Sequence, residues 1–213
     1  LAKGGTPLHS SPSRRCQMNP SIGLLTERLR LREYESPAEA AEAWARLNWS
    51  PMGGLAAPST EAPEVAIAFW DRLTGARSKA PRTRFELAVI LPATGALIGG
   101  VRIDVIDAAR SQGDIGYALY PGFWSQGYGT EAASELIRFG FEDLGLDRIW
   151  ATCDVTNAAS IRVLEKSGMC CHRTLPRGGP SRKGQQASYL FGLAVEDFRR
   201  RSLSHPCGVA ASP

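Results

Sequence analysis

The sequence is poor in the residues that bind metals or form disulfide bonds. Its three histidines, His9, His172 and His205, are far apart in the chain, and its five cysteines include no C-x-x-C pair. Cys170, Cys171 and His172 lie too close together in sequence for a zinc site. We therefore expect no bound metal, and we expect reduced thiols in a cytoplasmic protein.

Long apolar runs and a basic body are absent as well. No apolar stretch approaches the 18 residues of a membrane-spanning helix. The 213-residue chain has a net charge of +4, but residues 22–197 hold all 21 acidic residues and are weakly acidic overall. Nucleic-acid binding requires clustered Lys and Arg on the fold itself, so the charge pattern argues against DNA or RNA as a partner.

Composition predicts one domain between two tails. Residues 1–21 are rich in Ser, Pro and Gly, and neither they nor residues 199–213 include an acidic residue. We expect both segments to be mobile. Residues 22–198 contain no linker or repeat, and their length is sufficient for one hydrophobic core.

The body contains a series of short strands and helices. Alternating apolar residues predict a first strand over 24–34, and a hairpin of two strands is indicated around residues 92–95. The remaining periodicity predicts helices over 38–48, 62–74, 127–144 and 157–167 and strands over 84–91, 96–106, 113–120, 148–155, 169–174 and 187–195. This order is typical of a mixed α/β or α+β fold with one right-handed crossover at the centre of the sheet.

Residues 113–132, GDIGYALYPGFWSQGYGTEA, lead from a strand through a glycine-containing loop directly into a helix. The first N–H groups of a helix have no partner within the helix and lie at the positive end of its dipole, so this geometry suits a phosphate group. The segment is not a P-loop, because no Gly-Lys-Ser/Thr follows, and it lacks the third glycine of a dinucleotide fingerprint. The alternative is that Gly127 and Gly129 merely permit a tight turn.

Four motifs in this order resemble the GNAT N-acetyltransferase superfamily, and within it the RimJ/RimL type that acetylates protein N-termini. They are TERLRLR at 26–32, IGYAL at 115–119, WSQGYGTEA at 124–132 and NAASIRVLEKSGM at 157–169. The resemblance covers residues 24–195. It implies the GNAT fold, a mostly antiparallel sheet of about seven strands with flanking helices, splayed between the predicted strands 113–120 and 148–155.

The resemblance implies acetyl-CoA as the co-substrate, with its diphosphate on the loop N–H groups and its pantetheine arm beside the strand that ends near Leu119. The cofactor-binding residues it implies are Leu119, Trp124, Ser125, Gln126, Gly127, Tyr128, Gly129, Thr130 and Asn157. Trp124 stands where many members have Gln or Arg, and its alternative role is a packing anchor under the loop. Asn157 is also a favourable N-cap for the helix over 157–167.

Acetyl transfer requires an acid for the leaving thiolate and a base for the amine. Many superfamily members place a tyrosine seven residues after the Asn, but Leu164 stands there in this chain. The resemblance therefore implies Ser160 or a water as the acid, whereas a plain surface helix residue is the alternative for Ser160. The candidate bases are carboxylates near the centre of the sheet, with Asp114 and Asp154 ranked equally ahead of Asp104 and Glu86.

The expected function is transfer of an acetyl group to a primary amine, a protein N-terminus or a small amine, by direct attack in a ternary complex. The alternatives are an N-acetyltransferase for aminoglycosides, polyamines or other small metabolites, and a non-catalytic acyl-CoA-binding module. The acceptor is expected beside the helical pair over 38–74 and the loops 50–58 and 176–185. Trp44, Trp49 and Trp70 are candidates to line it, although aromatic residues at helical spacing belong more often to the core. Dimers are common in the family, so the resemblance adds a homodimer to the expected partners.

Overall fold

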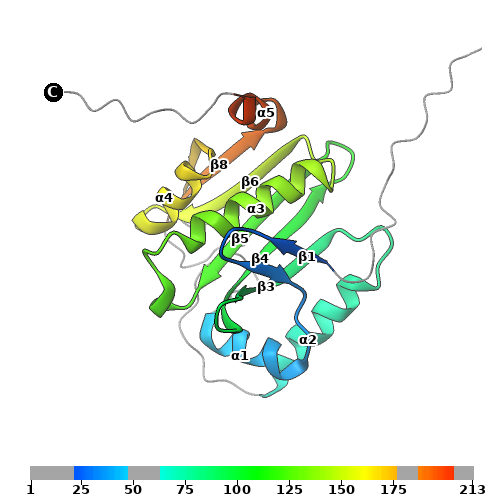
Figure 1. Ribbon diagram of the computed structural model, residues 1–213. Helices are drawn as coiled ribbons and strands as arrows, with labels where there is room; N and C mark the ends of the chain where they lie inside the picture. The colour runs from blue at the N-terminus through cyan, green and yellow to red at the C-terminus, as the bar shows by residue number, and fades with distance from the viewer. Residues whose placement is uncertain (1–21, 48–62, 177–186, 204–213) are drawn as a thin grey trace, which may run out of the picture.

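The computed structural model describes residues 22–47, 63–176 and 187–203 (Figure 1). They form one eight-stranded sheet in the order β1-β2-β3-β4-β5-β6-β8-β7 with helices on both faces. The elements in chain order are β1 (Gly23–Leu25), β2 (Arg30–Arg32), α1 (Pro37–Leu47), α2 (Pro63–Arg77), β3 (Arg84–Leu91), β4 (Ala96–Asp107), β5 (Gln112–Leu119), the 3-10 helix η1 (Pro121–Phe123), α3 (Tyr128–Glu142), β6 (Arg148–Asp154), α4 (Ala158–Lys166), β7 (Cys170–Leu175), β8 (Ser188–Ala194) and α5 (Val195–Leu203). The predicted mixed fold is confirmed.

The segment 24–34, predicted as one strand, forms two short strands, β1 and β2, that pair antiparallel. In the turn between them the Thr26 N–H donates to the Leu29 carbonyl, and the Thr26 hydroxyl accepts from the Leu29 N–H, both at 2.9 Å. A threonine side chain offers the backbone such local hydrogen bonds in place of a strand ladder, and apolar alternation does not reveal this. The sheet therefore has eight strands where about seven were predicted.

Among the described strands, one neighbouring pair is parallel, and its pairing is short. β5 and β6 pair only over Gln112–Asp114 and Arg148–Trp150, and all other neighbours are antiparallel. This confirms the predicted splay between the strands now seen as β5 and β6. We call the region between residues 115–119 of β5 and the following part of β6 the β5–β6 opening.

The core lies on both faces of the sheet. Along β3, Leu87 and Val89 belong to a cluster with α3, whereas Ala88 and Ile90 pack with residues of α1 and α2. Side chains alternate between the two faces of a strand, so one strand supplies both layers. α3, which connects β5 to β6, crosses one face of the sheet (Figure 1).

The chain was predicted to become a mobile tail at residue 199, but α5 continues to Leu203. Acidic residues in its first turn and basic residues in its last turn complement the helix dipole, and Phe198 packs on Phe141 with 5.0 Å between ring centroids. The rest of that tail, the N-terminal tail and residues 48–62 lie outside the described residues. None of the described helices combines the length and apolar character needed to cross a membrane.

Candidate functional site

The backbone of β5 faces the β5–β6 opening with groups that no described strand pairs. The Tyr120 N–H donates to the Ile98 carbonyl of β4 at 2.9 Å. Because backbone groups of successive residues point to opposite sides of a strand, those of Leu119 and Tyr117 point away from β4 and into the opening. Pairing with β6 ends at Asp114, so within the described strands no ladder uses these groups. The Leu119 carbonyl accepts from the Trp124 side chain, so the Leu119 N–H and the Tyr117 backbone groups are the ones that can bind an extended chain that bears amides.

α3 begins at the C-terminal end of β5 without a side-chain cap. The chain turns through left-handed conformations at Ser125 (φ 59°) and Gly127 (φ 85°), and Gly127 is the N-cap residue. The first helical hydrogen bond runs from Glu131 N–H to the Gly127 carbonyl at 3.1 Å. The N–H groups of residues 128–130 therefore have no acceptor within the helix, and the helix dipole favours an anion there.

The start of α3 lies close to both β5 and α4. A Cβ atom added to Gly129 would lie 3.4 Å from Val163 Cγ2 of α4 and 3.8 Å from Leu119 Cδ1 of β5. The structure thus brings the predicted loop residues 124–130 and Leu119 together at one end of the β5–β6 opening. Both distances are ordinary van der Waals contacts, so the positive φ of Gly127, rather than space at Gly129, is what requires a glycine in this loop.

Trp124 lies over the end of β5 rather than under the loop. Its indole Nε1–H donates to the Leu119 carbonyl at 2.7 Å, and 56% of the residue is exposed. This exposure contradicts the alternative role of a packing anchor under the loop. Gln126 also contacts the loop backbone, because its amide Nε2–H donates to the Gly122 carbonyl at 3.0 Å.

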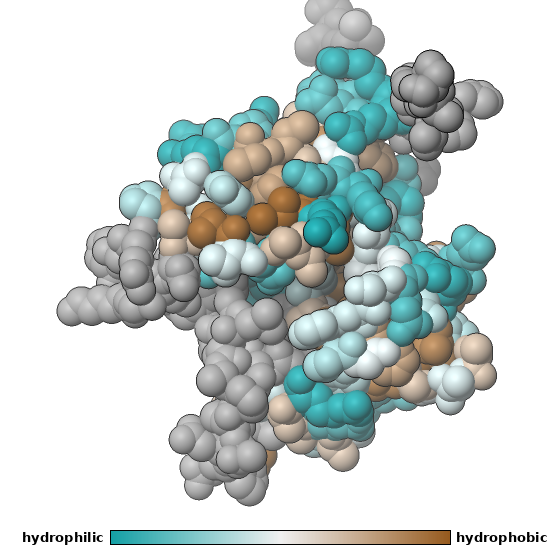
Figure 2. Space-filling view, turned by 90° about the vertical axis from the view of Figure 1, so that its left-hand side faces the viewer, coloured by the Kyte–Doolittle hydropathy of each residue, from teal (hydrophilic) through white to brown (hydrophobic). Residues whose placement is uncertain are grey.

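Apolar residues gather beside this site. Figure 2 shows the molecule from the side on which α4 lies in Figure 1, and hydrophobic residues occupy the middle of that face between hydrophilic ones. Leu119 and Tyr117 of β5 and Ile161 of α4 are partly buried hydrophobic residues that pack on the core here. A flexible, largely uncharged arm can bury apolar surface against such side chains.

The N-terminus of α4 carries two predicted site residues. The Asn157 Oδ1 accepts from the Ser160 N–H at 3.0 Å, which confirms the N-cap prediction. The Ser160 hydroxyl lies 2.8 Å from the Tyr117 hydroxyl, and Tyr117 also reaches the Ser160 carbonyl at 3.1 Å. Ser160 therefore faces β5 and is not a plain surface residue. These contacts join α4 to β5 beside the opening.

Tyr117 is a site residue that the sequence analysis missed. It lies within the IGYAL motif at 115–119, and strand alternation places it on the same face of β5 as Ile115 and Leu119, but neither signal assigned it a role. Burial raises the pKa of Tyr117 well above its ordinary value, although the hydrogen bond with Ser160 acts against the shift. Burial likewise raises the pKa of the nearby Cys153 thiol to about 11. Both groups therefore keep their protons at neutral pH.

Asp114 is held in an ion pair. Its Oδ2 lies 2.8 Å from Arg102 Nη2, and the same guanidinium holds Asp104 through Nη1 at 2.5 Å. Asp114 is also the last residue of β5 that pairs with β6, five residues before Leu119. The structure does not bring it to the loop or to Ser160.

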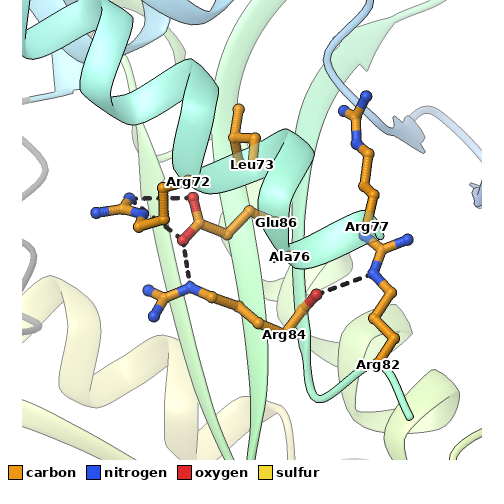
Figure 3. Close-up of a pocket in the computed structure, with 7 residues that line it drawn as sticks. All are labelled: Arg72, Leu73, Ala76, Arg77, Arg82, Arg84 and Glu86. Carbon is orange, nitrogen blue, oxygen red and sulfur yellow. Dashed lines mark hydrogen bonds and ion pairs between the residues drawn. The ribbon is translucent and has the colours of Figure 1, made fainter. Parts of the chain in front are cut away.

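Glu86 belongs to the same chain of ion pairs. Figure 3 shows its carboxylate between Arg84, at 2.7 Å, and Arg72, at 3.3 Å. The pocket drawn there is lined by Arg72, Leu73, Ala76, Arg77, Arg82, Arg84 and Glu86, and these side chains leave no space for a ligand. Glu86 and Asp104 are therefore engaged in structural ion pairs under α2.

Asp154 ends β6, beyond the last β5–β6 pair. Its Oδ1 accepts from the Thr156 N–H at 2.7 Å and from the Thr156 hydroxyl at 2.5 Å. These hydrogen bonds lower the pKa of Asp154. The Asp154 carbonyl accepts from the Asn157 N–H at 3.0 Å, so this residue belongs to the same turn as the α4 cap.

Much of the region where the amine acceptor is expected lies outside the described residues. This holds for Trp49, loop 50–58 and residues 177–185. Trp44 and Trp70 are partly buried members of the α1–α2 cluster, and Trp44 lies 5.3 Å from the Phe69 ring. For these two residues the core interpretation is the better one. Within the described ranges, no three His, Cys, Asp or Glu side chains group as metal ligands.

A mostly antiparallel sheet that opens at its parallel pair, beside an uncapped helix N-terminus, is the architecture of the GNAT acetyltransferases. Residues 28–170 match the family model described as an acetyltransferase (GNAT) domain. This match covers more than half of the chain. The chain therefore belongs to the GNAT family.

Individual proteins extend this likeness. The uncharacterized N-acetyltransferase p20 of Bacillus licheniformis is 35% identical over 114 residues, which are 53% of this chain and 64% of p20, slightly less than two thirds of that relative. The GNAT-family acetyltransferase structure from Bacillus anthracis has a TM-score of 0.65 and 23% identity, with 82% of this chain and 99% of that chain covered. Mycobacterium smegmatis RimJ, solved in complex with CoA-disulfide, has a TM-score of 0.63 and 21% identity over 82% and 88%. Both structural likenesses concern the fold.

Proposed function

We propose that the protein transfers an acetyl group from acetyl-CoA to a primary amine by direct attack in a ternary complex. The observation that carries this proposal is the uncapped start of α3 next to the part of β5 that β6 does not pair. N–H groups of residues 128–130 suit the diphosphate, and the Tyr117 backbone groups and the Leu119 N–H suit the amides of the pantetheine arm. The complex of Mycobacterium smegmatis RimJ with CoA-disulfide supports the same ligand class.

Ser160 is the proposed proton donor to the leaving thiolate. The Tyr117 hydroxyl can donate its one proton either to the Ser160 carbonyl, 3.1 Å away, or to Ser160 Oγ, 2.8 Å away. In the second arrangement the Ser160 proton is available to the leaving thiolate. The raised pKa of Tyr117 keeps that donor protonated. Burial and hydrogen bonding thus hold Ser160 in one orientation, which is what a positioned acid requires.

The amine must be neutral before it can attack, so a base or a water relay removes its proton. Asp154 is a better candidate than Asp114, because it lies beyond the last β5–β6 pair, whereas Arg102 holds Asp114. The lowered pKa of Asp154 makes it a weak base. The acceptor class is a protein N-terminus, as the RimJ/RimL motifs suggest, or a small amine such as a polyamine or aminoglycoside.

Two measurements test this proposal. Calorimetry with purified protein is expected to detect CoA binding, and thiol release is expected with at least one of N-terminal peptides, polyamines and aminoglycosides. Ser160→Ala should lower kcat by roughly 10²-fold with little change in the KM for acetyl-CoA. Ser134→Ala, a change at an exposed serine of α3, is the matched control and should leave kcat unchanged.

Each outcome separates the alternatives. No CoA uptake at millimolar concentration would overturn the proposal. Uptake without thiol release for any amine would identify a non-catalytic acyl-CoA-binding module. Normal kcat in the Ser160→Ala variant would assign the acid to another group or to water.

A further inference from the structure

The turn between β1 and β2 contacts the first turn of α3. The Arg28 backbone N–H donates to Glu131 Oε1 at 2.8 Å, and the Arg28 guanidinium binds Glu131 Oε2 through Nε at 2.8 Å and Nη2 at 2.7 Å. The Thr26 hydroxyl donates to the same carboxylate. Glu131 is thus held by both main chain and side chain of a segment about a hundred residues away.

The same guanidinium also reaches the loop itself. Arg28 Nη1 donates to the Gln126 carbonyl at 3.0 Å, and the guanidinium lies over the Tyr128 ring at 4.6 Å from its centroid. A trans peptide unit is planar, with its C=O and N–H pointing in opposite directions. By holding the Gln126 carbonyl, Arg28 therefore turns the Gly127 N–H away from itself.

Glu131 presents an electrostatic problem for an anion site. It lies in the first turn of α3, adjacent to the free N–H groups of residues 128–130. Burial alone would raise the pKa of Glu131, but hydrogen bonds from Thr26 and Arg28 outweigh it and hold the pKa below its ordinary value. The carboxylate is therefore charged at neutral pH, and without Arg28 it would repel a diphosphate at the helix end.

We infer that Arg28 is a positioning residue for the diphosphate of coenzyme A: it cancels the Glu131 charge and fixes the peptide between Gln126 and Gly127. This inference rests on the proposed function. It gives the TERLRLR and WSQGYGTEA motifs a common task, because Thr26 and Arg28 of the first contact Gln126, Tyr128 and Glu131 of the second.

The test compares two acetyl donors that differ in the diphosphate. Acetyl-CoA has it, and S-acetyl-pantetheine lacks it. Arg28→Gln should raise the KM for acetyl-CoA about tenfold or more, while kcat and the KM for S-acetyl-pantetheine stay near the wild-type values. Arg30→Gln removes the same charge from an exposed position two residues away and should change neither KM.

A second variant isolates the charge effect. Adding Glu131→Gln to Arg28→Gln removes the repelling carboxylate, so the double variant should recover part of the lost acetyl-CoA affinity. Glu131→Gln alone leaves Arg28 in place and should bind CoA at least as tightly as the wild type. This single variant keeps the inference testable if Arg28→Gln fails to fold, which circular dichroism would report.

Three results would overturn the inference. The first is that Arg28→Gln raises the KM for both acetyl donors by the same factor. The second is that the double variant recovers none of the lost acetyl-CoA affinity. The third is that Glu131→Gln alone weakens CoA binding. Each of these requires a wild-type protein that binds CoA normally. Failure of the wild type to bind CoA would instead overturn the proposed function, so the two failures are distinguishable.

Discussion

At the scale of single residues, the two loop glycines have different tasks. Gly127 has φ 85°, and a Cβ there would also lie 3.2 Å from Arg28 Nη2. Gly129 has ordinary helical geometry, and its added Cβ would make a contact of 3.4 Å with Val163. Gly127→Ala should therefore cost about 1–2 kcal/mol of unfolding free energy and weaken CoA binding. Gly129→Ala is the control and should keep the stability of the wild type.

Urea unfolding and CoA titration of both variants check this prediction. Equal losses in the two variants would mean that the loop requires small residues in general rather than a left-handed N-cap at Gly127. A Gly127→Ala variant with unchanged stability would show that Arg28 and the loop backbone relax at little cost.

The residues that could be predicted from the sequence are those with local signals. A helix start and a left-handed turn are specified within a few positions, so residues 124–130 and the Asn157 cap could be identified. Tyr117 contacts Ser160 across 43 positions, and Arg28 contacts Glu131 across 103. No periodicity reports such distant contacts. The same limitation applies to Asp114, whose partner Arg102 comes from a neighbouring strand.

At the scale of elements, α3 lies so close to the sheet that it needs a glycine. A Cβ at Gly140 would lie 2.7 Å from Ile149 Cδ1 and 2.8 Å from Ile103 Cδ1. Gly140→Ala should therefore destabilise the protein by about 1–3 kcal/mol, because overpacking exceeds the gain in helix propensity. Gly75 lies in α2 with no atom within 4 Å of an added Cβ. Gly75→Ala should stabilise by about 0.5–1 kcal/mol.

The opposite signs of these two changes are the test, measured by urea unfolding of both variants. Stabilisation by Gly140→Ala would mean that α3 can move outward freely.

Elements themselves were predicted well where periodicity extends over many residues, as in α3 and β3. The break between β1 and β2 could not be predicted, because it depends on hydrogen bonds of the Thr26 side chain.

At the scale of the whole molecule, paired carboxyls and buried acids should limit stability at opposite ends of the pH range. Burial acts to raise the pKa of Glu39, but hydrogen bonds from Arg32 and the Glu35 backbone outweigh it and lower the pKa, as the contacts of Glu131 do. Below about pH 4.5 the unfolded chain then binds more protons than the folded one, so stability falls as the pH falls.

The alkaline side has the opposite sign. Burial raises the pKa of Cys153 to about 11 and raises that of Tyr34 as well. Above about pH 9 the unfolded chain releases these protons before the folded one does, so stability falls as the pH rises. Urea midpoints measured against pH should show a plateau near neutrality. Glu39→Gln should flatten the acid limb, whereas Glu27→Gln, at an exposed carboxyl, should not; an unchanged acid limb in Glu39→Gln would contradict this account.

The short β5–β6 pairing has a mechanical consequence. It divides the sheet into two parts, strands β1–β5 and strands β6–β8, which three residue pairs join within the sheet. A ligand bound between these two parts would supply hydrogen bonds where strand pairing is missing. Its binding free energy would add to the stability of the folded sheet, so that the bound molecule would serve as a part of the scaffold.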